Sequence, residues 1–285
     1  MTDGNARYPK ILLTGGTGQL GHELEQTLKT FGNIWSPNRL EFDLSDPESL
    51  RKKIQKNQPN LIINSAAYTN VEKAESEIKL ARTINAEAPK VMAEEANKLN
   101  IPLVHYSTDY VFDGEKQTPY TEEDDPNPRN IYGTTKLEGE QAIQKAHDQY
   151  LILRTGSLYN PKRGNNFYRT MLKIFENKKE ISVVNDQTMA PTSVKFLAKK
   201  TTQILKQLNP KKQFERRWKL YNLTENVRMS WFQFALKIYE ENNSNTKLVV
   251  KRILPVNSNT YLPSLTRPKF SVLNNSLIYK SFQLI

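Results

Sequence analysis

Three glycines at intervals of three, placed directly after a short apolar run, constrain the fold of this chain more than any other feature. The run is Lys10–Thr14, the glycines are Gly15, Gly18 and Gly21, and leucines recur at helical spacing at positions 20, 24 and 28. The pattern predicts a strand, a tight turn and a helix. Glycine permits φ > 0 and close approach of the backbone to a ligand, and a helix N-terminus presents free N–H groups. The motif is typical of a turn that binds the pyrophosphate of a dinucleotide.

Strand-like and helix-like segments alternate through the first 160 residues. Strands are predicted at 33–35, 60–65, 101–107 and 150–154, and helices at 46–54, 87–99 and 136–146. Strand and helix in this order indicate right-handed βαβ units with a parallel sheet covered on both faces. The predicted fold class is therefore α/β, a Rossmann-type doubly wound parallel sheet with a smaller C-terminal substrate-binding lobe.

The alternation loosens after about residue 160. Helices are predicted at 166–175, 192–208 and 230–241, strands at 181–184 and 219–223, and a polar loop at 209–217. The tail, which contains Pro255, Pro263 and Pro268, is expected to be mostly loop. Residues 1–160 and about 192–226 are assigned to a nucleotide-binding domain, and residues 161–191 and 227–285 to the substrate lobe.

Composition excludes several kinds of chemistry. The chain has no cysteine and three unpaired histidines, so disulfides, cysteine nucleophiles and a histidine-built zinc site are not expected. The acidic residues Glu122–Asp125 are interpreted as a solvated loop and not as a ligand set, so no metal-binding residues are predicted, while dependence on Mg²⁺ stays open. No apolar run is long enough for a signal peptide or a membrane span, and a cytoplasmic protein without a membrane partner is expected.

The charge differs between the two halves. Residues 1–150 carry 17 basic and 23 acidic residues, net −6, whereas residues 151–285 carry 24 and 7, net +17. A basic half favours an anionic partner, although solvated surface lysines would give the same count. The basic clusters lack interleaved aromatic residues and match no DNA-binding motif, so no nucleic-acid partner is expected.

Tyr132 and Lys136 form a Tyr-x-x-x-Lys pair at the start of a predicted helix. Residues four apart share a helix face, so the phenol and the ammonium can project into one cleft. A neighbouring cation favours the phenolate, so Lys136 is expected to lower the pKa of Tyr132 toward the working range of an acid catalyst. An accidental surface pair is the alternative, and the glycine turn in the same chain argues against it.

Together with Ser107 and Thr108, these motifs resemble the extended short-chain dehydrogenase/reductase family. Within that family the chain resembles reductases of sugars linked to dTDP. The segments that carry this resemblance span almost the whole chain in order and lie at 14–21, 64–75, 106–114, 132–140, 164–167 and 185–192. The resemblance implies hydride transfer from a nicotinamide to the C4 ketone of a dTDP-4-keto-6-deoxy sugar, in a chain that could form a homodimer.

The resemblance also implies roles for individual residues. Tyr132 would donate the proton, Lys136 would hold the nicotinamide ribose, and Thr108 would bind the reacting carbonyl. The cofactor-binding residues would be Gly15, Thr17, Gly18, Gln19, Leu20, Gly21, Asn38, Arg39, Asp43, Leu44, Ala66, Ala67, Tyr68, Asn85, Tyr132 and Lys136. The substrate-binding residues would be Val71, Thr108, Asp109, Tyr110, Ser157, Asn166, Gln187, Thr192 and Arg267.

The residues that follow the second predicted strand indicate which cofactor the chain prefers. An acidic side chain there commonly binds the ribose of NAD, whereas a 2′-phosphate needs a cation in its place. The chain has Asn38 followed by Arg39 at this point. NADPH is therefore the expected cofactor, with NADH as the alternative.

Two departures from the family pattern keep other functions open. Ser157 stands where many of these reductases carry a tryptophan, and the chain ends at Ile285, where relatives usually continue into a terminal helix. Loss of an aromatic contact weakens binding by about 1–3 kcal/mol. A reductase acting on another 4-keto-6-deoxy nucleotide sugar is therefore one alternative. A non-catalytic, NADP-binding regulatory subunit, as found with methionine adenosyltransferase, is another.

Overall fold

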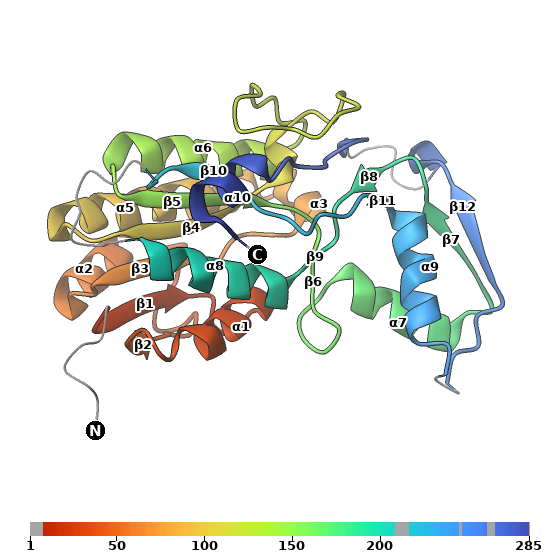
Figure 1. Ribbon diagram of the computed structural model, residues 1–285, viewed down its shortest axis with the longest axis horizontal. Coiled ribbons are helices and arrows are strands. Elements are labelled where there is room, and N and C mark those ends of the chain that lie inside the picture. The colour runs from red at the N-terminus through yellow and green to blue at the C-terminus, as the bar shows by residue number, and fades with distance from the viewer. Residues whose placement is uncertain (1–7, 209–216, 245–246, 261–265, 285) are drawn as a thin grey trace.

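A six-stranded parallel sheet forms the centre of the molecule (Figure 1). The computed structural model describes residues 8–208, 217–244, 247–260 and 266–284. Its strands are β1 (Lys10–Thr14), β2 (Asn33–Trp35), β3 (Leu61–Asn64), β4 (Leu103–Thr108), β5 (Tyr150–Thr155) and β10 (Leu220–Asn222). The α/β class and the doubly wound parallel sheet predicted from the sequence are confirmed.

The strand order places a switch point beside the glycine turn. The order across the sheet is β10-β5-β4-β3-β1-β2, so the chain leaves β1 toward β2 and then returns to the other side of β1 with β3. Ligands of doubly wound sheets bind outside the carboxyl ends of the strands at such a point. The crevice is therefore expected between the ends of β1 and β3.

Helices cover both faces of the sheet because side chains alternate along each buried strand. Ile11 and Leu13 of β1 pack with α1 (Gln19–Leu28) and α8 (Val194–Gln207), whereas Leu12 packs into a second core with α2 (Pro47–Asn57) and α5 (Ala88–Leu99). Helix α6 (Ile131–Ala146) lies against α5 on this second face. Two short helices, α3 (Val71–Ala74) and α4 (Ile78–Arg82), and a π-helical turn at Thr83–Glu87 precede α5.

A second group of elements extends from the carboxyl edge of the sheet, at the right of Figure 1. It has its own aromatic-rich core, to which α7 and α9 contribute. Its elements are α7 (Phe167–Asn177), β7 (Glu180–Val184), β8 (Thr188–Met189), β11 (Met229–Ser230), α9 (Trp231–Glu241) and β12 (Arg252–Val256). The short parallel pair β6 (Leu158–Tyr159) and β9 (Thr192–Ser193) lies where the chain passes between the sheet and this group.

The C-terminal tail corrects the sequence prediction. It contains β12, which pairs in parallel with β7, and α10 (Ser276–Phe282), whose Ile278 and Phe282 are buried in the core beside β10. The tail is thus not mostly loop, and the chain does have a helix close to its end. Short 3₁₀ turns lie at Asp109–Val111 and Ser258–Thr260. The predicted loop at 209–217, except Arg217, and Pro263 lie outside the described residues.

Candidate active site

The glycine turn packs too tightly to admit larger residues. Gly15 has φ +73°, and the Gly18 N–H donates a 2.8 Å hydrogen bond to the Gly15 carbonyl. A Cβ added to Gly21 would lie 2.1 Å from that same carbonyl oxygen. The first turn of α1 is therefore held against the end of β1. Its residues Gln19, Leu20 and Gly21 line the crevice, where the first N–H groups of a helix can bind an anion.

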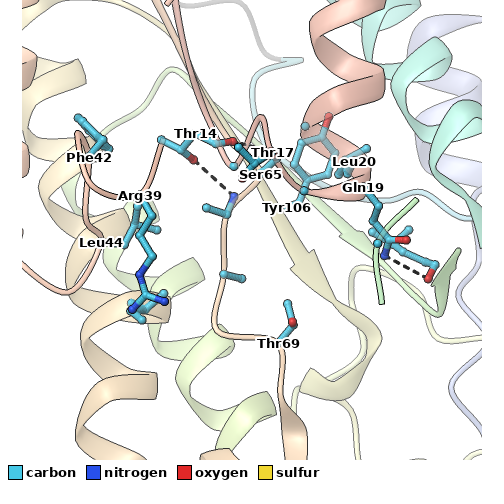
Figure 2. A pocket seen from close by; sticks show the side chains of 18 of the residues that line it. Thr14, Thr17, Gln19, Leu20, Arg39, Phe42, Leu44, Ser65, Thr69 and Tyr106 are labelled. Carbon is cyan, nitrogen blue, oxygen red and sulfur yellow. Dashed lines mark hydrogen bonds between the residues drawn. The ribbon is translucent and has the colours of Figure 1, made fainter. Parts of the chain in front are cut away.

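A cavity of about 460 Å³ opens in front of this turn, at the switch point of the sheet. In Figure 2, Arg39, Phe42 and Leu44 lie at one end of the cavity and Gln19 at the other. Most of the predicted cofactor-binding residues line it, namely Gly15, Thr17, Gly18, Gln19, Leu20, Gly21, Arg39, Asp43, Leu44, Ala66, Ala67, Tyr132 and Lys136. The structure thus brings the glycine turn and the Tyr-x-x-x-Lys pair to one cavity.

Three predicted cofactor residues do not line this cavity. The Asn38 side-chain oxygen accepts hydrogen bonds from the backbone N–H groups of Leu40 and Glu41, which shapes the loop after β2. The Tyr68 hydroxyl donates to Glu77 at 2.7 Å. Asn85 accepts from the Tyr68 N–H at 2.8 Å and so holds the loop after β3 in place. Its side chain comes from the π-helical turn, a feature that is common at functional sites.

Other residues of the cavity wall were not among the predicted site residues. They are Thr14, Pro37, Phe42, Ser65, Thr69, Ile84, Tyr106, Ser107, Thr155, Leu158, Gly164 and Asn165. Four of these, Thr14, Ser65, Ser107 and Thr155, lie at or just after the carboxyl ends of strands in the sheet. The rule that ligands bind at that edge could have found these four. The loop residues Gly164 and Asn165 follow no such rule, and only their place in the segment 164–167, which carries the resemblance, could have indicated them.

Tyr132 and Lys136 occupy the first turns of α6. Asn130 caps this helix by accepting a 2.8 Å hydrogen bond from the Gly133 N–H. The Lys136 side chain is 1 % exposed, and its Nζ donates to the Tyr106 carbonyl at 2.7 Å and lies 3.0 Å from His105 Nε2. The Tyr132 ring packs edge-to-face on Tyr110, with 5.8 Å between the ring centroids. The phenol of Tyr132 and the amine of Lys136 line the same cavity, but the amine is hydrogen-bonded to groups of β4.

The pKa values of this pair correct one expectation. Burial raises the pKa of Tyr132 above its ordinary value, against the opposite effect of a hydrogen bond with Thr108, and Lys136 is not among the causes. Burial lowers the pKa of Lys136 to about 8. The prediction that Lys136 lowers the pKa of Tyr132 is therefore wrong for this structure, because the amine is directed to His105 and the Tyr106 carbonyl. Tyr132 therefore carries its proton at neutral pH.

Thr108 and Asp109 lie beside Tyr132 at the end of β4. The Thr108 hydroxyl donates to Asp109 Oδ1 at 3.1 Å and accepts from the Tyr110 N–H at 3.1 Å. Asp109 is 2 % exposed, and burial raises the pKa of its carboxyl group to about 6. Hydrogen bonds with Ser271 and Thr108 lower that pKa against the larger effect of burial. A Cβ on Gly156 would approach Asp109 Oδ2 to 2.7 Å.

A second cavity of about 460 Å³ lies between α3, α7 and β7. Three predicted substrate residues line it, namely Asn166, Gln187 and Arg267, together with Glu72, Phe167 and Trp231, which were not predicted. Arg267 Nη2 lies 3.0 Å from Glu72 Oε1, so the C-terminal segment is tied to α3 across this cavity. Asn165 belongs to both cavity walls, so the two cavities adjoin.

The other predicted substrate residues lie outside the lining of this second cavity. Val71 begins α3, and Thr108, Asp109 and Tyr110 lie at the end of β4. Thr192 is fully buried, and its N–H donates to the Ser157 carbonyl at 3.2 Å. Ser157 has φ +45°, a conformation that is uncommon for a residue with a side chain.

Within the described residues, no group of three or more His, Cys, Asp and Glu side chains is arranged to hold a metal ion. Among the helices that the structure describes, none is both long and apolar enough to cross a membrane.

The fold and site define a class, that of Rossmann-fold reductases with a Tyr-x-x-x-Lys pair facing a dinucleotide cavity. The family model described as RmlD substrate binding domain matches residues 9–285. The chain is 36 % identical to dTDP-4-dehydrorhamnose reductase of Shigella flexneri over 280 residues, which cover 96 % of this chain and 92 % of that protein. It is 37 % identical to the Salmonella typhimurium enzyme of the same name, with the same coverage.

Solved structures agree with the sequence comparison. The crystal structure of dTDP-4-dehydrorhamnose reductase from Bacillus anthracis in complex with NADP superposes with a TM-score of 0.87 at 33 % identity, covering 96 % of this chain and 92 % of that one. The chain therefore belongs to the dTDP-4-dehydrorhamnose reductase family.

Proposed function

We propose that this chain is an NADPH-dependent reductase that converts the C4 ketone of dTDP-4-dehydro-L-rhamnose to the alcohol of dTDP-L-rhamnose. The observation that carries the proposal is that Tyr132 and Lys136 line the same cavity as the glycine turn. The family and its NADP-bound relative support the cofactor and the substrate.

The residues that line the first cavity fit a dinucleotide that carries a 2′-phosphate. The tight contact between Gly21 and Gly15 leaves the N–H groups of the first turn of α1 free to bind a pyrophosphate. Arg39 is the cation at the end of the second strand that would bind a 2′-phosphate, and its position on the cavity wall favours NADPH over NADH. Ala66 and Ala67 leave room beside the turn.

The chemistry is a hydride transfer coupled to a proton transfer. The bound NADPH supplies the hydride for C4 of the sugar. Tyr132 donates its phenolic proton to the C4 oxygen, so the ketone becomes an alcohol and the phenolate takes a proton from solvent afterwards. Burial keeps Tyr132 protonated before the reaction. Thr108 orients the carbonyl beside Tyr132, and Lys136 holds the nicotinamide ribose.

The second cavity is assigned to the nucleotide part of the substrate. Arg267 is a guanidinium that can pair with a phosphate, and Asn166 and Gln187 are polar groups that can fix its orientation. Val71, Asp109, Tyr110, Ser157 and Thr192 are assigned to the sugar side. We also assign residues 1–160 and about 192–226 to the nucleotide-binding domain, and residues 161–191 and 227–285 to the substrate lobe, except that α10 packs in the core of the nucleotide-binding domain beside β10.

A second candidate is a reductase for another 4-keto-6-deoxy nucleotide sugar. It is favoured by Ser157, whose small side chain stands where many relatives carry tryptophan, at a position with φ +45°. A regulatory role without catalysis is less favoured, because Tyr132 and Lys136 both face the cavity. The chain could also form a homodimer, which sedimentation of the purified protein would test.

The assay combines the purified protein with NADPH and dTDP-4-dehydro-L-rhamnose, follows loss of nicotinamide absorbance, and identifies the product sugar. Tyr132→Phe should bind NADP⁺ normally and lose about 100-fold or more in turnover, since it lacks the proton donor. Tyr150→Phe, at the opposite end of the sheet, is the control and should retain full activity. Full activity of Tyr132→Phe would contradict the mechanism, and a different product sugar would favour the second candidate.

A further inference from the structure

A continuous chain of buried polar side chains connects the end of β1 to Lys136. The Thr14 hydroxyl lies 2.6 Å from the Asn64 side-chain oxygen, and Asn64 Nδ2 lies 3.0 Å from His105 Nδ1. On the other side of the ring, His105 Nε2 lies 3.0 Å from Lys136 Nζ. The chain crosses β1, β3 and β4 and ends on α6. It thus links the residue before the glycine turn to the amine of the Tyr-x-x-x-Lys pair.

His105 remains neutral in this setting. The side chain is 1 % exposed, and burial together with the charge of Lys136 holds its pKa well below the ordinary value. A neutral imidazole has one donor and one acceptor nitrogen, so its two hydrogen bonds must have opposite sense. The bond to Lys136 therefore determines what His105 can offer to Asn64.

Two arrangements satisfy this requirement. An ammonium has only donors, so with charged Lys136 the Nε2 atom accepts, Nδ1 carries the proton, and Asn64 must present its oxygen to the ring. A neutral amine also offers a lone pair, so Nε2–H can then donate to Lys136, Nδ1 accepts, and Asn64 presents its NH₂ group. This is the amide orientation in the structure, where the Asn64 oxygen accepts from the Thr14 hydroxyl and the Ala66 N–H. Charged Lys136 thus requires the Nδ1–H tautomer of His105. Only neutral Lys136 permits the Nε2–H tautomer, which the hydrogen bonds of Thr14 and Ala66 to the Asn64 oxygen favour.

The groups that face Lys136 are few in the described residues. They are Glu140 on α6, whose charge acts on Lys136, and His105 on β4, which contacts Nζ. Tyr132 lines the same cavity, and Arg154 on β5 pairs with Glu140 at 2.7 Å. Burial lowers the pKa of Lys136 and the charge of Glu140 raises it, with the result of about 8. Of these groups, His105 is the one with a direct hydrogen-bond contact to Nζ.

We propose that His105 is a positioning residue of the active site, which holds the Lys136 amine toward the cofactor ribose and couples its protonation to Asn64 and Thr14 at the end of β1. The kinetic part of this proposal rests on the proposed reductase function. The hydrogen-bond part does not, and it can be tested without turnover.

The direct test is the tautomer of His105, read from ¹⁵N chemical shifts in protein labelled at histidine. His105 should be in the Nδ1–H form near pH 6.5 and change to the Nε2–H form above about pH 9, without forming an imidazolium between. The spectrum of His105→Gln identifies which of the three histidines gives these signals. One unchanged tautomer from pH 6 to pH 10, or an imidazolium at neutral pH, would overturn the proposal.

The kinetic test is the pH profile of kcat/KM. In His105→Leu the buried ammonium loses an acceptor, so the alkaline limb should move down by roughly one pH unit. His105→Gln should retain the wild-type limb, because an amide offers both an acceptor and a donor. In the double variant Asn64→Leu/His105→Leu, the alkaline limb of the kcat/KM profile should move no further than in His105→Leu. The reason is that Asn64 acts on Lys136 only through the His105 imidazole.

The control is Thr201→Val, which removes a buried 2.7 Å contact between Thr201 and the Tyr106 hydroxyl without touching Lys136. It should lower the melting temperature and leave the pH profile in place. If His105→Leu behaves in the same way, His105 has only a structural role and the proposal is wrong. If the wild type shows no reductase activity, the proposed function fails, while the tautomer measurement still decides the coupling.

Discussion

Arg39 lines the nucleotide cavity with three quarters of its side chain exposed, and its Nε lies 3.9 Å from Asp43 Oδ1. This weak ion pair leaves the guanidinium available for a phosphate. Arg39→Ala should raise the KM for NADPH by about tenfold and change the KM for NADH little, because a charge-assisted hydrogen bond contributes about 1.5 kcal/mol or more. Steady-state kinetics with both cofactors measure this. Arg82→Ala, whose arginine pairs with Glu138 on the surface, is the control.

Asp109 gives a pH-dependent prediction, because burial raises its pKa from 3.8 to about 6. Between these values the unfolded chain has an ionised carboxylate and the folded chain a protonated acid. Fewer protons are then bound in the unfolded state, so stability falls as pH rises toward 6 and stays lower above it. From pH 4 to pH 7.5, the wild type should lose about 2 kcal/mol of unfolding free energy relative to Asp109→Asn. Urea denaturation of both proteins at each pH measures the difference; an equal response to pH would contradict the pKa shift.

The sequence indicated which residues meet at the site better than it indicated their charge states. The spacing of Tyr132 and Lys136 places both on one face of α6, and both line the cavity. A buried amine, however, takes the acceptors within its reach, and these come from His105 and Tyr106 on β4. Such partners depend on how β4 lies against α6, which helix periodicity does not contain.

Among the elements, those of the sheet were predicted well and those of the tail poorly. Buried parallel strands are near-continuous apolar runs between amphipathic helices, so β1, β3, β4 and β5 have clear local patterns. Strand β12 pairs with β7, some 70 residues earlier, and contains Pro255. Its side chains are largely exposed or half-buried, so no apolar alternation marks it.

Helix α10 contributes two fully buried side chains, Ile278 and Phe282, and the Phe282 ring packs edge-to-face on Tyr221 of β10 with 5.4 Å between centroids. Phe282→Ala should therefore lower the free energy of unfolding by about 3 kcal/mol, the usual effect of removing a buried aromatic ring. Equilibrium urea denaturation measures this change. Lys280→Ala, on the exposed side of the same helix, should change stability by less than about 0.5 kcal/mol. A similar small effect of Phe282→Ala would mean that α10 does not anchor the end of the chain.

At the scale of the whole molecule, the charge difference between the two halves of the sequence indicated an anionic partner. The two adjoining cavities are where such a ligand can bind. The nucleotide cavity lies at the edge of the sheet, and the second cavity brings Arg267 from the C-terminal segment over to Glu72 on α3. These two residues are 195 positions apart in the sequence. No local pattern could predict their contact.

The Glu72–Arg267 ion pair makes a prediction about the whole molecule, because it joins the second cavity across segments distant in sequence. Glu72 is exposed, so the pair contributes little to stability, but it neutralises the guanidinium that we assign to the substrate phosphates. Glu72→Gln should therefore bind dTDP about threefold more tightly than the wild type at low salt, a gain that should fade in 0.5 M salt as charges are screened. Calorimetric titration with dTDP at both ionic strengths measures this. Glu138→Gln, which removes a comparable surface ion pair with Arg82, should leave dTDP affinity unchanged. Weaker binding by Glu72→Gln would mean instead that Glu72 holds Arg267 in its binding position.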